Sequence, residues 1–321
     1  MQRRHLLAAS AALFPLSALA QTSWPNKPLR LIVGFPPGGG IDFTARTIQP
    51  ALEAALGQSV VIDYKPGAGG VLAATELTRA APDGYTLLVA NTGPFAIAPY
   101  LQTKMPYDPV KQFSYLGQIA ETAYIAATLA DHPANDLKAF VDWARANPGK
   151  ANFASGGIGA STHLNGELLN VVAGIDLVHV PYKGSAPAVT DLIGGQTHLL
   201  IDAGTVLLPQ IKSGRLKALA VTGAHRDNNL PEVATVREQG FAGMEAVGFQ
   251  GLVGPAGLPR DVVERLSTEL RKVLASADVR GKFSAAGAEV NPRGAAEFAA
   301  YVKAESEKWS TLIAKRGIKL D

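Results

Sequence analysis

The chain has 321 residues, of which 47% are hydrophobic and 18% are charged, and it contains no cysteine. The lack of cysteine excludes disulfides, thiolate catalysis and cysteine-ligated zinc or iron–sulfur sites. Its formal net charge of +3 gives no electrostatic footprint for nucleic acid, so we expect no nucleic-acid partner. A chain of this length favours two domains.

Residues 1–20 have the pattern of a secretory signal peptide. Arg3 and Arg4 precede an apolar run over residues 6–19, which ends in Ala18-Leu19-Ala20. The run is shorter than the ~20 residues of a membrane span. We expect cleavage after about Ala20, which leaves 28 basic and 27 acidic residues and a net charge of +1. The paired arginines leave both the general secretory and the twin-arginine export routes open.

From residue 29 onward, short apolar runs alternate with helical patterns, which is typical of parallel βα units. The apolar runs are continuous because strands of parallel sheets are buried on both faces. The pattern predicts strands over residues 29–35, 60–64 and 85–90 and helices over 41–56 and 71–81.

A long extended segment, residues 115–129, is predicted to cross into a second lobe. The second lobe is predicted to be another βα sandwich. Its predicted helices are 137–146, 161–172, 186–193 and 206–212, and its predicted strands are 151–155, 177–180, 197–202 and 216–221.

The chain is then predicted to return to the first lobe through an extended run at 247–253. Apolar residues fall on one face of two later helical segments, which need a sheet to cover. We therefore predict an α/β fold in which residues 21–122 and 246–321 form a discontinuous lobe 1. Residues 123–245 form lobe 2.

Glycine-rich loops follow two of the predicted strands, and each precedes a helix. Ligands of open parallel sheets bind beyond the carboxyl ends of the strands. Glycine lets backbone amides approach an anion there, and the helix dipole adds roughly half a positive charge. The candidate anion-binding residues of the two loops are Gly38, Gly39, Gly157, Gly159, Ser161 and Thr162. Neither loop contains an arginine.

Four further polar residues are candidates for the same cleft. Asn91 and Thr92 follow the third predicted strand, so they should point at the ligand. Asp202 ends an apolar strand and either caps the next helix or accepts a hydrogen bond from a ligand amine or hydroxyl. Asp42 is also a candidate, although its residue type favours a helix cap, and Ser161 can cap a helix while still offering its hydroxyl.

Enzyme motifs are incomplete in this sequence. Residues 36–40 lack the Gly-Lys-Ser/Thr ending of a P-loop, and residues 157–162 depart from the dinucleotide fingerprint. There is no Gly-x-Ser-x-Gly elbow. His163 and Glu167 lie four residues apart on a predicted helix, so they could bind one metal together. The favoured interpretation is an ordinary pair of side chains on one face of the helix. We therefore expect no catalytic residue, no metal and no cofactor.

Eight motifs, taken as an ordered set, resemble the Bug-type periplasmic substrate-binding proteins of tripartite tricarboxylate transporters. They cover essentially the whole mature chain, at residues 24–28, 35–42, 65–70, 82–87, 155–164, 180–184, 219–222 and 254–259. The resemblance implies a type II periplasmic-binding-protein fold, whose two lobes are joined by crossing strands and close on the ligand. Where relatives often carry a serine or glycine pair after the third strand, this chain has Asn91-Thr92.

The family resemblance also implies a role. It implies a non-enzymatic periplasmic receptor, expected to be a monomer, that captures an organic acid, an acidic amino acid or an aromatic acid. Backbone amides at the two glycine loops would hold one carboxylate, and Asp202 matches a specificity-setting acidic position. The expected partners are the ligand and the membrane subunits of the transporter. A ligand-sensing partner of a two-component system and an exported enzyme remain alternatives.

Overall fold

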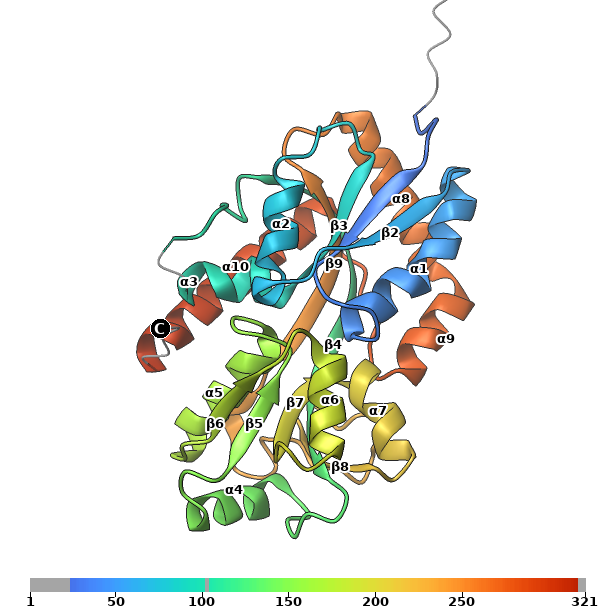
Figure 1. The fold of residues 1–321 in the computed structure, drawn as a ribbon. Coiled ribbons are helices and arrows are strands. Elements are labelled where there is room, and N and C mark those ends of the chain that lie inside the picture. Colours follow the sequence, from blue (N-terminus) through green and yellow to red (C-terminus); the bar gives the residue numbers. More distant parts are fainter. Residues whose placement is uncertain (1–23, 102–103, 317–321) are drawn as a thin grey trace, which may run out of the picture.

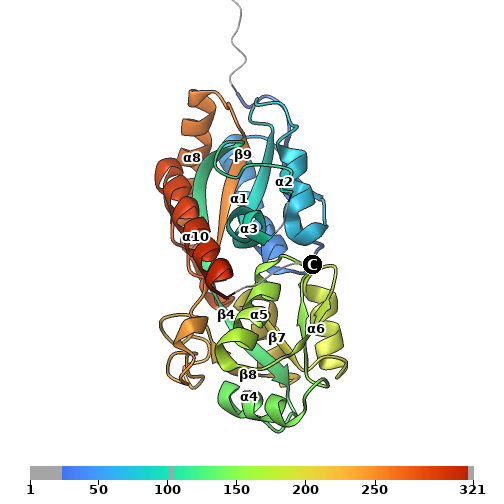
Figure 2. The ribbon, with the colours of Figure 1, turned by 90° about the vertical axis from the view of Figure 1, so that its left-hand side faces the viewer.

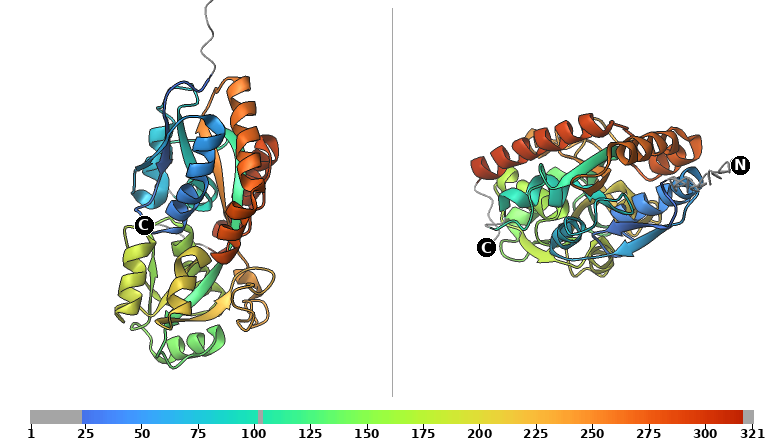
Figure 3. Two further views of the ribbon diagram at one scale, coloured as in Figure 1. Left: turned by 90° about the vertical axis from the view of Figure 1, so that its right-hand side faces the viewer. Right: turned by 90° about the horizontal axis from the view of Figure 1, so that it is seen from above.

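A computed structural model describes residues 24–101 and 104–316, so the predicted signal peptide lies outside the described residues. The described chain forms two α/β lobes, one above the other in Figure 1, with β4 and β9 near their junction. Figure 2 and Figure 3 show the elongated outline from three further directions. The predicted fold class is therefore confirmed.

The first lobe is built on a sheet with the strand order β2-β1-β3-β9-β4. β1 pairs in parallel with both β2 and β3, whereas β9 pairs antiparallel with β3 and β4. The strand bounds are β1 Leu29–Val33, β2 Val60–Tyr64, β3 Thr86–Asn91, β4 Phe113–Leu129 and β9 Val247–Pro255.

The strands of the second lobe join the same sheet through the C-terminal part of β4. There β4 pairs antiparallel with β7 and β8, and the order continues as β7-β5-β6 with parallel pairing. The strand bounds are β5 Asn152–Ser155, β6 Val178–Pro181, β7 Leu199–Ala203 and β8 Leu216–Val221. β4 is thus the predicted crossing strand.

The exchange of partners along β4 locates the junction of the lobes. Ala123 still pairs with Val247 of β9, whereas Tyr124 pairs with Ala203 of β7. The lobe boundaries at residues 122/123 and 245/246 stay a prediction.

Helices cover the sheet in both lobes, and α8 and α10 pack against β4. The long C-terminal helix α10 runs along one flank of the molecule toward the lobe junction (Figure 2). The helix bounds are α1 Gly40–Leu56, α2 Val71–Leu77, α3 Ala98–Leu101, α4 Leu137–Ala146, α5 Ser161–Ala173, α6 Ser185–Ile193, α7 Gly204–Lys212, α8 Arg260–Ala275, α9 Ala277–Ala285 and α10 Ala295–Arg316. No helix of the described segments has both the length and the hydropathy to cross a membrane.

Three local features differ from the sequence predictions. Helix α2 ends at Leu77 rather than at residue 81. A π-helical turn, Gly93–Ile97, and the short helix α3 follow β3. Helix α9 was not predicted because its amphipathic signal is weak, with only Val279 and Phe283 buried along it.

Candidate functional site

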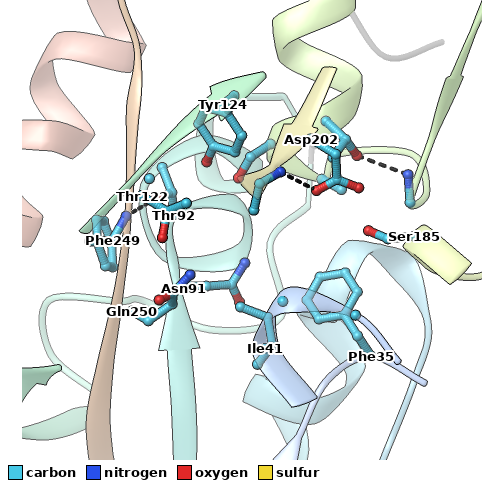
Figure 4. A pocket seen from close by; sticks show the side chains of 18 residues that line it. Phe35, Ile41, Asn91, Thr92, Thr122, Tyr124, Ser185, Asp202, Phe249 and Gln250 are labelled. Carbon is cyan, nitrogen blue, oxygen red and sulfur yellow. Dashed lines mark hydrogen bonds between the residues drawn. The ribbon is translucent and has the colours of Figure 1, made fainter. Parts of the chain in front are cut away.

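A cavity lies between the lobes, where the carboxyl ends of β1, β3, β5 and β7 meet. It contains about 600 Å³ of space between atoms, including its opening to solvent. Figure 4 shows the side chains around it. The lining residues are Phe35, Gly39, Gly40, Ile41, Asn91, Thr92, Thr122, Tyr124, Gly156, Ala160, Ser161, Thr162, Ser185, Asp202, Ala203, Gly248, Phe249 and Gln250.

Four helix N-termini reach this cavity, those of α1, α5, α6 and α7, and we call them the helix-terminus side. Their N-cap residues are Gly39, Ala160, Gly184 and Ala203. Within the described chain, none of these four caps makes a side-chain hydrogen bond to its helix. Backbone amides of the first turns are therefore free of capping side chains, and the helix dipoles favour an anion.

Polar side chains behind the second glycine loop fix its shape. Thr162 Oγ1 accepts a hydrogen bond from Gly156 N at 2.8 Å, and His163 Nδ1 accepts one from Gly159 N at 3.3 Å. The His163 ring stacks on the ring of His179 with centroids 3.9 Å apart. Burial lowers the pKa of His179 to about 4, and the neighbouring His163 acts in the same direction. His179 is therefore uncharged at neutral pH, and its Nε2 lies 2.6 Å from Oγ of Ser155, which precedes the loop.

The first-lobe wall of the cavity combines uncharged polar side chains with the apolar side chains of Phe35, Ile41 and Phe249. Asn91 of β3 lies directly opposite Gln250 of β9 in the antiparallel register, and we call these two residues the amide pair. Figure 4 shows them side by side. Nearby, Thr92 Oγ1 accepts a hydrogen bond from Phe249 N at 2.8 Å. Thr122 is 2% exposed, and its hydroxyl has no partner among the described residues.

Asp202 lies across the cavity from the amide pair (Figure 4). Its Oδ1 accepts from Ala203 N at 2.7 Å, whereas its Oδ2 has no hydrogen-bond partner in the described part of the chain. Burial raises the pKa of Asp202 to about 6, although the Ser185 hydroxyl and the Ala203 amide oppose this rise. One oxygen therefore accepts from the local backbone, and the other has no partner within hydrogen-bond distance among the described residues, although the Ser185 hydroxyl lies nearby.

Around the cavity, the two lobes touch through glycine backbones. A Cβ atom added at Gly69 of lobe 1 would lie only 2.7 Å from the carbonyl oxygen of Ile158 in lobe 2. A Cβ at Gly184 would likewise lie 2.8 Å from Pro36 Cδ. These separations are too short for any side chain, so the closeness of the lobes depends on glycine at these positions.

The structure brings most of the sequence-predicted site residues to this cavity. Gly39, Asn91, Thr92, Ser161, Thr162 and Asp202 line it. Gly157 and Gly159 are not among the lining residues and instead shape the second loop, with φ angles of +133° and +79°.

Gly38 and Asp42 lie at a neighbouring groove that is also lined by Thr205 of α7 and Lys282 of α9. Asp42 is not the N-cap of α1, which is Gly39. Its Oδ2 accepts from Gly38 N at 2.8 Å, and its Oδ1 accepts from Arg46 Nε at 2.8 Å and from the Tyr64 hydroxyl at 2.6 Å. Both oxygens are thus engaged within the first lobe.

Four polar lining residues were not predicted from the sequence, namely Thr122, Tyr124, Ser185 and Gln250. Gln250, a polar side chain in the otherwise apolar run of β9, was a usable signal, because buried polar side chains in strands need a partner. His163 and Glu167 approach to 3.6 Å, and the described residues contain no group of three side chains placed to hold a metal.

Comparison with known proteins identifies a family to which this chain is similar. Residues 44–318 match the model of the tripartite tricarboxylate transporter family receptor. A solved structure of the periplasmic binding protein BugD is 35% identical, with a TM-score of 0.89, and the match covers 92% of this chain and 99% of that one.

Two ligand-bound structures from Rhodopseudomonas palustris are also similar. Rpa4515 with adipate is 31% identical with a TM-score of 0.89, over 92% of this chain and 99% of that one. MatC with bound malate is 31% identical with a TM-score of 0.87, over 90% and 100%. The resemblance drawn from the motifs is thereby confirmed. The chain belongs to the receptors of the tripartite tricarboxylate transporter family.

Proposed function

We propose that this chain is an exported receptor that captures a small carboxylate-bearing solute between its lobes in the periplasm. It presents that solute, as a monomer, to the membrane subunits of a tripartite tricarboxylate-type transporter. The observation that carries the proposal is the helix-terminus side, where four uncapped helix N-termini surround one cavity. Among the described residues that line the cavity, none is lysine or arginine, so backbone amides and hydroxyls supply the anion-binding groups.

The solved relatives and the residues that line the cavity support one class of ligand. Solved relatives carry adipate and malate, and both compounds have carboxylates at the two ends of a short carbon chain. In this chain, one ligand carboxylate sits against the first turn of α5, near Ser161. The free Oδ2 of Asp202 accepts from a ligand hydroxyl or ammonium group.

The proposal also covers processing and domain motion. The signal peptide is removed after about Ala20, and residues 21–122 with 246–321 move as one lobe against residues 123–245. The bending point lies where β4 changes partners, at Ala123 and Tyr124. Closing lobes give the membrane subunits a liganded form to recognise.

A binding role rather than a catalytic one is supported by the chemistry of the cavity. Its titratable lining side chains, within the described residues, are Tyr124 and Asp202. Burial raises the pKa of Tyr124 to about 12, so its hydroxyl stays protonated as a hydrogen-bond donor. The family and its solved members are solute-binding proteins.

Thermal-shift screening of the protein purified after export tests the proposal. The panel contains organic acids, amino acids and neutral sugars, and mass spectrometry of the same sample reports the N-terminus. A carboxylate at 100 times its dissociation constant should stabilise the protein by about 2.7 kcal/mol. Stabilisation by sugars alone would overturn the proposal, as would turnover of a bound acid into a product.

A further inference from the structure

The amide pair is placed by the pairing of strands β3 and β9. Residues directly opposite in an antiparallel pair have their side chains on the same face, with Cβ atoms about 4.5–5.5 Å apart. Asn91 and Gln250 stand in that relation and both line the cavity. They are 9% and 5% exposed. Two nearly buried amides therefore face the ligand together.

Thr44 of helix α1 contacts the side-chain amide of Gln250 inside lobe 1. Thr44 is fully buried, and its Oγ1 lies 3.3 Å from Gln250 Oε1 and 3.1 Å from Gly40 O, so its single hydrogen is shared between these two acceptors. The carbonyl oxygen of Gln250 therefore has a partner inside lobe 1. Its amide nitrogen is left to donate into the cavity, toward an oxygen of the ligand.

The charges around the amide pair determine which chemical group of the ligand can supply that oxygen. The described lining residues include no cation, and Asp202 lies across the cavity. A carboxylate at the amide pair would form no ion pair there. A neutral carboxamide oxygen accepts the same hydrogen bonds, so it can take the place of the carboxylate. A methyl group in that place would leave nearly buried donors unpaired, which costs about 1–3 kcal/mol.

We infer that Asn91 and Gln250 are the specificity-determining residues of the cavity. They select short carboxylates that carry a second oxygen acceptor at the other end of the chain, and they do not distinguish a carboxylate from a carboxamide. This inference rests on the proposed function, because it takes the first carboxylate to lie at the helix-terminus side.

Isothermal titration calorimetry with matched ligands tests the inference. Succinate, succinamate and butyrate share four carbons and differ in the distal group. Adipate, adipamate and hexanoate repeat the series at six carbons. In the chain length that binds, we expect the diacid and the monoamide to agree within about fivefold and the fatty acid to bind roughly 10- to 100-fold more weakly.

Two variants connect this selectivity to the amide pair. Asn91→Leu removes one amide at similar volume, so the diacid and monoamide should weaken about tenfold while the fatty acid is unchanged. Gln250→Glu replaces donors by an anionic acceptor. The diacid of the chain length that binds should then weaken roughly 100-fold. The amino acid of the same length, 4-aminobutyrate or 6-aminohexanoate, has a distal ammonium and should bind at least about tenfold more tightly than it binds the unmodified protein.

The matched control is Gln196→Glu, the same change at an exposed turn after α6, which should leave all affinities unaltered. The gain for the amino acid cannot arise from a folding defect, and Asn91→Leu decides the matter if Gln250→Glu does not fold. Equal affinity across a series, no binding of either series, or unchanged selectivity in both variants would overturn the inference. If the wider screen finds no carboxylate at all, the proposed function fails as well.

Discussion

The helix-terminus side and the amide pair face the same cavity but recognise a ligand by different means. The first uses backbone amides and helix dipoles from α1, α5, α6 and α7, whereas the second uses two side chains on neighbouring strands. Backbone groups present the same donors whatever the side chains are, so this side suits the carboxylate that every ligand shares. Side chains can be exchanged one at a time, so the other side suits discrimination. The difference teaches that capture and selectivity can change separately in this fold.

The largest expected effect comes from filling the helix-terminus side. Ser161→Trp places an indole at the first turn of α5, inside the cavity, and should abolish binding of every carboxylate, with a loss beyond roughly 1,000-fold. Ser276→Trp, at an exposed serine that caps α9 without a side-chain hydrogen bond, is the control. Calorimetry and circular dichroism on both variants measure binding and folding. Retained affinity in Ser161→Trp would move the carboxylate away from α5.

The next effect concerns how the two sides come together. Gly69→Ala puts a methyl group 2.7 Å from Ile158 O of the other lobe, so the closed form should lose population and affinity should fall on the order of 100-fold. Gly57→Ala is the matched control, because its φ of +67° is close to the +61° of Gly69 and nothing lies within 4 Å of its added Cβ. Equal losses in affinity for the two variants would show that backbone strain, not lobe contact, is responsible.

A smaller effect concerns the pH dependence of the unfolding free energy. It depends on Asp202 and not on the helix-terminus side or the amide pair. Because the folded-state pKa of Asp202 is raised to about 6, the folded protein binds this proton more tightly than the unfolded chain does. The stability it contributes is present below the unfolded pKa near 4 and is lost as the pH rises through about 6. Relative to Asp202→Asn, the protein should therefore lose about 2 kcal/mol of unfolding free energy between pH 4 and pH 7. Urea titrations at several pH values measure this difference, and parallel curves for the two proteins would contradict it.

The smallest effect is that of salt. A cavity whose described lining has no lysine or arginine holds the carboxylate by short-range hydrogen bonds, so screening should matter little. Raising sodium chloride from 50 to 500 mM should weaken binding by less than about threefold. Titration calorimetry at the two salt concentrations provides the check. A tenfold weakening would mean that a cationic side chain reaches the ligand.

The two sides also differ in how far the sequence alone predicts them. The glycine loops lie between a strand and a helix that are adjacent in the chain, so local pattern placed Gly39, Ser161 and Thr162 at the ends of strands. The crossing strand β4 and the return strand β9 were predicted for the same reason, from long apolar runs. The position of these elements shows in the local sequence, whereas the pairing of β4 with β9 joins segments far apart in the chain.

The amide pair depends on contacts between residues far apart in sequence. Asn91 was a candidate, but Gln250 was not, because their juxtaposition requires the register of β9 against β3, which no local pattern encodes. Asp42 shows the converse limit. Its residue type favours a cap at the start of α1, yet Arg46, Tyr64 and Gly38 N together bind its carboxylate. Only the packed structure shows those three donors around one side chain.

The central claim, that backbone groups at four helix ends hold one carboxylate, is tested most directly by titrating succinamate and succinamide into the unmodified protein. The two compounds differ only in whether one end is a carboxylate or an amide. The account predicts that succinamate binds and that the diamide binds at least about 100-fold more weakly, because helix N-termini favour an anion over a neutral group. Equal affinity for the two compounds would contradict it.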